Sequence, residues 1–109
     1  MPREYRQHID DIIESVTYIK EYVVGMGFDE FVADRKTRDA VIRNLEIIGE
    51  AAKALPDEIK QKANSIEWHK IVALRNILIH EYFGVNIKLV WDVVKNKLEE
   101  LETECKSLL

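Results

Sequence analysis

Several residue types are scarce in this chain of 109 residues, and each scarcity excludes a class of protein. The only cysteine, Cys105, excludes an internal disulfide and any metal site built from several cysteines. It lies near the end of an expected helix, where a packing or surface role explains it better than a nucleophilic one. The four glycines and two prolines leave little room for long loops.

Long apolar runs are also missing, since none approaches the roughly 20 residues that a membrane-spanning helix needs. The first residues turn polar and acidic at once, so we expect no signal peptide. Both observations favour a cytoplasmic protein without a membrane partner. An apolar fraction of 47% and a charged fraction of 33% are ordinary for a globular chain. We therefore expect a single domain over residues 1–109.

Positive charge is not in excess either, because the formal net charge is −4. Proteins that bind nucleic acid normally carry a basic face. A nucleic-acid enzyme of this composition would have to gather positive charge locally, with Arg38, Arg43 or Lys70 clustering around Arg75. A dimer would bring two such sets together, and the acidic remainder suits a protein partner with a basic surface.

Apolar residues recur every three or four positions over long stretches, which is the spacing of amphipathic helices. Such stretches cover residues 3–24, 36–55, 68–79 and 87–101, and shorter helices are expected at 28–33 and 57–63. Asp34 or Thr37 would cap the second long helix, and Asn86 the last. The short breaks favour antiparallel neighbours. We therefore predict an all-α fold, an up-and-down bundle of four main helices plus one or two short ones.

Two features of the second long helix need a tertiary explanation. Gly49 in mid-helix costs about 1 kcal/mol relative to alanine, which predicts a close crossing with another helix or another subunit. Glu46 and Glu50 are four residues apart and could hold a metal together. No Glu-x-x-His occurs in the chain, however, and ferritin-like metal sites need it. We expect no metal; instead, one glutamate would position an arginine of the active region and the other would be solvated.

The polar groups that suggest chemistry lie close together near residue 80, where Arg75, Asn76, His80 and Tyr82 stand within eight positions beside an aliphatic run. Histidine both gives and takes a proton near neutral pH. Arginine binds phosphate oxygens with two parallel hydrogen bonds. The pair suits cleavage of RNA, whose own 2′-hydroxyl is the nucleophile, without a metal. Equally, an arginine and a histidine near a helix end would cap its last carbonyls and favour the negative pole of its dipole.

Helical spacing constrains how these groups meet. Asn76 and His80 would lie on one face, whereas Arg75 and His80 would point about 140° apart. Either the helix ends or bends before His80, or Arg75 swings its side chain round, or the site combines residues of two chains. Tyr82 would lie on the exit turn, exposed to a modifying partner, or it would be a half-buried packing aromatic. The remaining histidines, at positions 8 and 69, are expected at the surface.

The spacing Arg75-Asn76-x-x-x-His80-x-Tyr82 resembles the R-x4-H-x-Y signature of the HepT-like toxins, which belong to the HEPN superfamily. The flanking segments also fit that family: they are residues 43–52, Trp68 and residues 90–94. Arginine-x4-histidine alone is a weak pattern. Joined to the tyrosine and to these flanks, the resemblance is specific and covers nearly the whole chain.

The resemblance implies a HEPN-like helical domain that dimerises and acts as an RNA-cleaving toxin. Arg75 and His80 would be its catalytic residues, and Asn76 would occupy the polar position that commonly follows the arginine. The usual partner is a small nucleotidyltransferase antitoxin of the MNT type. That partner would neutralise the toxin by transferring AMP to the motif tyrosine, here Tyr82.

Two classes of function remain open. The first is an endoribonuclease toxin, independent of metals and cofactors, that acts on RNA such as tRNA or mRNA rather than on DNA. It would leave a 2′,3′-cyclic phosphate and a 5′-hydroxyl. One histidine per chain cannot easily serve as both base and acid, so two motifs would meet at a homodimer interface. The second is a non-catalytic helical module that a nucleotidyltransferase binds and modifies, with Tyr82 as AMP acceptor and Arg75 on the nucleotide phosphates. A purely structural dimer is disfavoured by the polar content of the motif.

Overall fold

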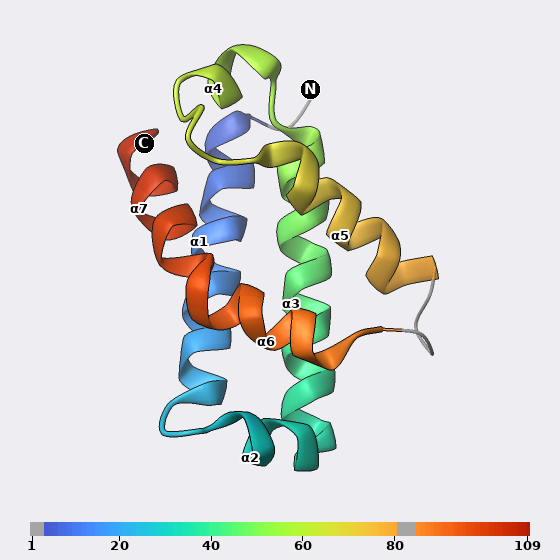
Figure 1. Ribbon diagram of the computed structural model, residues 1–109. Coiled ribbons are helices and arrows are strands. Elements are labelled where there is room, and N and C mark those ends of the chain that lie inside the picture. Colours follow the sequence, from blue (N-terminus) through green and yellow to red (C-terminus); the bar gives the residue numbers. More distant parts are fainter. Residues whose placement is uncertain (1–3, 81–84) are drawn as a thin grey trace.

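The computed structural model describes residues 4–80 and 85–109, and the regular elements in these ranges are all helices (Figure 1). They are α1 (Tyr5–Val23), α2 (Phe28–Ala33), α3 (Arg35–Ala54), α4 (Asp57–Gln61), α5 (Trp68–His80), α6 (Ile87–Asn96) and α7 (Leu98–Ser107). The predicted all-α fold is confirmed. No helix within the described ranges is long and apolar enough to cross a membrane.

The two longest helices, α1 and α3, lie side by side and antiparallel at the centre of the fold (Figure 1). Both place the apolar residues of one stripe in the core. The fully buried side chains of these two helices include Ile9, Ile12, Val16, Ile19, Val41 and Ile48. Burial of each such side chain stabilises the fold by about 1.5–3 kcal/mol, so this pair is the rigid support for the other helices.

The connection from α1 to α3 follows local signals in the sequence. Gly25 ends α1 with φ 75°, a left-handed conformation that favours glycine. Asp34 is the residue that caps α3, because its carboxylate accepts hydrogen bonds from the backbone N–H of Thr37 (3.0 Å) and from its hydroxyl (2.8 Å). These bonds lower the pKa of Asp34. Phe31 of α2 is fully buried, whereas Phe28 is 37% exposed, so only one of the two phenylalanines enters the core.

The C-terminal part forms two helices where the sequence pattern predicted one. The break falls at Lys97 (φ −117°), between α6 and α7. It lets α6 pack beside α2 while α7 turns to run along α1 (Figure 1). At the second contact the ammonium group of Lys20 lies 2.7 Å from a carboxylate oxygen of Glu99 and 2.7 Å from one of Glu102.

Helix α5 packs chiefly on α3, and its C-terminal end projects from the body of the fold (Figure 1). Trp68 fixes its first turn, because the indole N–H donates to the carbonyl of Ala63 (3.2 Å) at the end of the preceding segment. Only Trp68 and Leu78 of this helix are buried, while Ile77 and Ile79 are 39% and 36% exposed. A helix with apolar residues on several sides is normally covered on those sides. A single chain therefore leaves apolar surface of α5 uncovered.

Candidate functional site

Arg75 leaves α5 directly opposite Gly49 of α3. A Cβ atom built on Gly49 would overlap the Cβ of Arg75, and it would lie 2.8 Å from its Cγ and 3.3 Å from the carbonyl oxygen of Ile71. Non-bonded carbon atoms normally stay about 3.5–4.0 Å apart. The close crossing that Gly49 predicted is therefore confirmed, and it joins two helices of the same chain.

Two neighbouring side chains hold the guanidinium of Arg75. One terminal nitrogen, Nη1, donates to the amide oxygen of Asn76 at 2.9 Å, and the other, Nη2, lies 3.4 Å from a carboxylate oxygen of Glu50. The side chain of Arg75 is 22% exposed, that of Glu50 51%. The Nε atom of Arg75 is buried without a hydrogen-bond partner among the described residues. The site thus contains a partly buried cation whose head group is fixed at two points.

The expectation that one of two glutamates contacts an arginine of the motif is confirmed for Glu50. Glu46, expected to be solvated, is instead mostly covered, with a side chain only 17% exposed that lies 3.6 Å from Arg43. The expectation that Glu46 is solvated was therefore wrong, because its carboxylate pairs with Arg43, one turn earlier on the same helix.

His80 is the last residue of α5, and it is exposed. Because α5 continues through His80, the alternative in which the helix ends or bends before this residue is wrong. Within residues 4–80 and 85–109, no hydrogen bond joins Arg75 to His80: the guanidinium contacts Glu50 and Asn76 instead. Asn76 lies one turn before His80 on the same face of the helix. One chain therefore presents its imidazole outward, about 140° around the helix from the position of Arg75.

Other residues expected at the site lie elsewhere or outside the described part. Tyr82, the expected AMP acceptor, falls in residues 81–84 and is outside the described residues. Lys70 does not join Arg75; its ammonium group lies 2.8 Å from Glu67. Arg43 pairs with Glu46, as described above. His69 is exposed, as expected.

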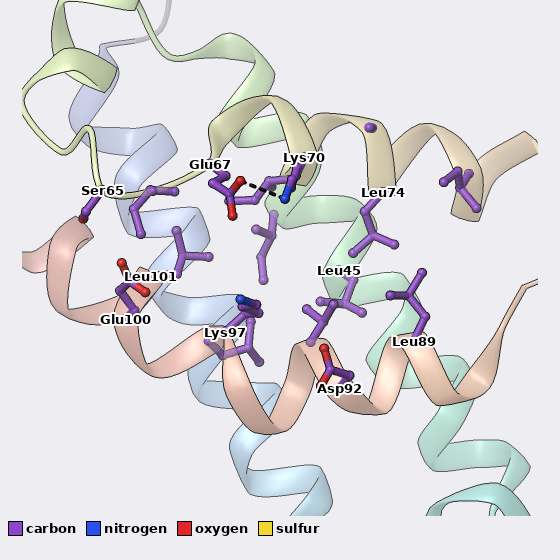
Figure 2. Close-up of a pocket in the computed structure, with 17 residues that line it drawn as sticks. Leu45, Ser65, Glu67, Lys70, Leu74, Leu89, Asp92, Lys97, Glu100 and Leu101 are labelled. Atoms are coloured by element: carbon purple, nitrogen blue, oxygen red, sulfur yellow. Dashed lines mark ion pairs between the residues drawn. The ribbon is translucent and has the colours of Figure 1, made fainter.

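An apolar groove that the sequence did not predict lies between α5 on one side and α6 and α7 on the other (Figure 2). Its volume is about 390 Å³. The lining is mostly aliphatic: Leu45, Ile48, Ile71, Leu74, Ile77, Leu89, Val93, Leu98 and Leu101. Charged groups of both signs stand around it, among them the Glu67–Lys70 pair, Lys97 and Asp92 (Figure 2). None of the three motif residues Arg75, Asn76 and His80 lines this groove.

The potential metal ligands and the single thiol of the described part can also be located. Across residues 4–80 and 85–109, no group of three or more histidine, cysteine, aspartate or glutamate side chains is arranged to hold a metal ion. Cys105 is fully buried, and this burial raises the pKa of its thiol to about 12. A thiol in this environment is inert at neutral pH and packs as a small apolar side chain.

The all-α bundle, with an arginine-x4-histidine motif on a helix that crosses a central helix at a glycine, defines a HEPN-like fold. The family model described as "Ribonuclease HepT-like" matches residues 12–108. This chain therefore belongs to the HepT-like ribonuclease family.

Three curated relatives with ribonuclease names match this chain over nearly all of their own length. "Probable ribonuclease HepT" of Thermococcus cleftensis is 38% identical over 108 residues, which cover 99% of this chain and 98% of the relative. "Putative RNase TTE0752" of Caldanaerobacter subterraneus is 41% identical over 108 residues, covering 99% and 94%. "Putative RNase MJ0127" of Methanocaldococcus jannaschii is 42% identical over 113 residues, covering 99% and 93%. No solved structure matches the chain significantly.

Proposed function

We propose that this protein is a metal-independent endoribonuclease in which Arg75 and His80 act on the scissile phosphodiester. Membership of a ribonuclease family supports the reaction class. One observation supports the assignment of residues most directly: the guanidinium of Arg75 is held at two points in a partly covered position. A cation fixed before substrate arrives stabilises developing charge without having to reorganise during the reaction.

The proposed reaction involves two proton transfers, one to a base and one from an acid, and it exchanges one bond at phosphorus. His80, exposed at the end of α5, removes the proton of the 2′-hydroxyl, whose oxygen then attacks the adjacent phosphorus. The bond from phosphorus to the 5′-oxygen breaks, and that oxygen receives a proton. The products are a 2′,3′-cyclic phosphate and a 5′-hydroxyl. Proton transfer of this kind contributes typically about 10²–10⁴ in rate, and Arg75 would stabilise the charge on the phosphorane.

A homodimer would complete the site, because one imidazole does not readily act as base and acid in the same turnover. The second histidine would come from the partner subunit. The uncovered apolar surface of α5, including Ile77 and Ile79, supports an interface on this helix beside His80. Two copies of Arg75 would also raise the local positive charge that a protein with a net charge of −4 needs in order to bind RNA.

The biological setting we infer is a toxin–antitoxin pair. The partner would be a nucleotidyltransferase antitoxin of the MNT type, which neutralises the toxin by transferring AMP to Tyr82. Tyr82 follows His80 by two residues, so a nucleotide attached there would add bulk and negative charge next to the imidazole. Modification would then block RNA binding at the site that performs cleavage.

The experiment that tests the reaction class is cleavage of total RNA and of purified tRNA by the partner-free protein, with and without EDTA. The expected result is cleavage that survives chelation and yields fragments with 2′,3′-cyclic phosphate and 5′-hydroxyl ends. Fragments with 3′-hydroxyl ends, or activity lost with EDTA, would contradict the mechanism. A folded, unmodified dimer that cleaves no RNA would favour the second function, a binding module modified by a nucleotidyltransferase.

A further inference from the structure

Glu50 stands beside Gly49 on α3, so that one turn of this helix meets Arg75 twice. The glycine lies against the stem of the arginine, and the glutamate carboxylate lies against its head. We propose that Glu50 is a positioning residue that fixes the guanidinium plane of Arg75 for catalysis; this inference rests on the ribonuclease function proposed above.

The geometry explains why Glu50 is needed in addition to Asn76. Asn76 follows Arg75 directly in the chain and accepts a hydrogen bond only from Nη1, at 2.9 Å. This single contact, to the neighbouring residue on the same helix, does not by itself fix the orientation of the guanidinium plane. The second contact comes from a different helix and involves Nη2, at 3.4 Å. Two contacts on two nitrogens define the plane, and the arginine head group is a rigid fork that uses such a definition well.

The close crossing makes this contact possible. Gly49 lets α5 approach α3 until the Arg75 stem contacts the backbone, which brings the head group within reach of the next residue, Glu50. With a larger residue at position 49, the two helices would separate and the contact between Glu50 and Arg75 would lengthen. The glycine and the glutamate therefore act together on one arginine.

The carboxylate of Glu50 has a second effect of opposite sign. Its negative charge lies beside the cation that RNA phosphates would approach, and its side chain is 51% exposed. It therefore weakens the binding of a polyanion while it orients the arginine. These two effects distinguish a positioning residue from a merely structural one. Loss of the contact should lower kcat, whereas loss of the negative charge should lower KM for RNA.

The kinetic test compares Glu50→Ala, which removes contact and charge, with Glu50→Gln, which keeps an amide oxygen at the same reach. We expect Glu50→Ala to lower kcat about tenfold, a loss that corresponds to the weak end of the free energies of hydrogen bonds to charged groups. Glu50→Gln should keep kcat within about threefold. Both variants should lower KM for RNA about two- to threefold at low salt, because each removes one negative charge.

The matched control is Glu46→Gln, which removes the same charge from the same helix one turn away, at a residue that faces Arg43. It should leave kcat and KM within about twofold of the parent. Equal denaturant midpoints for the two Glu50 variants and the parent would show that the fold is retained. The inference is overturned if Glu50→Ala keeps the parental kcat, or if Glu50→Gln is impaired as much as Glu50→Ala.

A second readout does not depend on cleavage. In ¹⁵N spectra of arginine side chains, restricted rotation gives separate Nη signals, and those of Arg75 are identified by their loss in Arg75→Lys. We expect separate signals in the parent and in Glu50→Gln, and averaged signals in Glu50→Ala. Signals that stay separate in Glu50→Ala would overturn the positioning role. If the parent protein cleaves no RNA at all, the proposed function fails, while these spectra still decide whether Glu50 fixes Arg75.

Discussion

Replacing Gly49 with alanine tests the packing that supports the site. The added Cβ would overlap the Cβ of Arg75 and lie 2.8 Å from its Cγ. Restoring ordinary carbon–carbon contact to the Cγ alone needs a shift of about 0.7 Å, and the closer Cβ makes α5 move farther than that. The obstacle is a Cβ atom fixed to the backbone, and it does not swing aside like the end of a flexible side chain. Overpacking of this kind costs up to about 3 kcal/mol. Alanine regains about 1 kcal/mol as a better helix former, which leaves a net loss of about 2 kcal/mol.

Urea denaturation measures this loss as a lower transition midpoint with an unchanged slope. The control is the same substitution in an Arg75→Gly background, where both the Cβ and the Cγ are gone and the nearest remaining atom given for the added Cβ is the carbonyl oxygen of Ile71, at 3.3 Å. There Gly49→Ala should be neutral or stabilising by up to about 1 kcal/mol. An Arg75→Ala background should not relieve the loss, because the overlapping Cβ remains. A Gly49→Ala protein as stable as the parent would refute the reasoning.

Three further outcomes are expected. Lys20 holds the pKa of Glu99 below its usual range by hydrogen bonding, so this contribution to stability is present above the unfolded pKa and is lost as the pH falls through the lowered folded pKa. Lys20→Met should therefore flatten the acidic part of a stability-versus-pH curve measured by urea denaturation. Cys105, with a pKa of about 12, should resist a thiol-reactive disulfide reagent at pH 8 and react only after denaturation; rapid reaction of the native protein would contradict its burial. Ile77→Glu should give a folded monomer by sedimentation, with cleavage activity at least tenfold lower; a dimer of parental activity would exclude α5 from the interface.

Local signals in the sequence correctly predicted those features that depend on a single residue, such as the helix caps. Asp34 accepts the hydrogen bond from Thr37 that a cap requires, and Asn86 does the same for the N–H of Leu89 at 3.2 Å. Gly49 in mid-helix predicted a close crossing, because only close packing would compensate the helix stability that a glycine loses relative to alanine. The family signature identifies Arg75, and the helical spacing predicted that Glu46 or Glu50 would contact an arginine; the structure shows that this glutamate is Glu50.

The features that sequence reasoning missed depend on packing between distant segments. The apolar seam continues through Val94, Leu98 and Leu101 without a glycine or proline, so nothing local marks the bend at Lys97. That bend depends on α6 meeting α2 and α7 meeting α1. The groove of Figure 2 has the same origin, because it forms only where α5 stands apart from α6 and α7.

The proposal that Arg75 and His80 are the catalytic residues of a ribonuclease is tested most directly by single-turnover rates of RNA cleavage. The variants to compare are His80→Ala and Arg75→Ala, with His69→Ala as the control. His69 is an exposed histidine on the same helix, so its loss removes an imidazole without affecting the proposed site. We predict a fall of at least about 10² for His80→Ala, in line with the usual contribution of general acid–base catalysis. Arg75→Ala should show a comparable fall, and His69→Ala no more than a twofold change. Parental rates for folded His80→Ala protein would contradict the account.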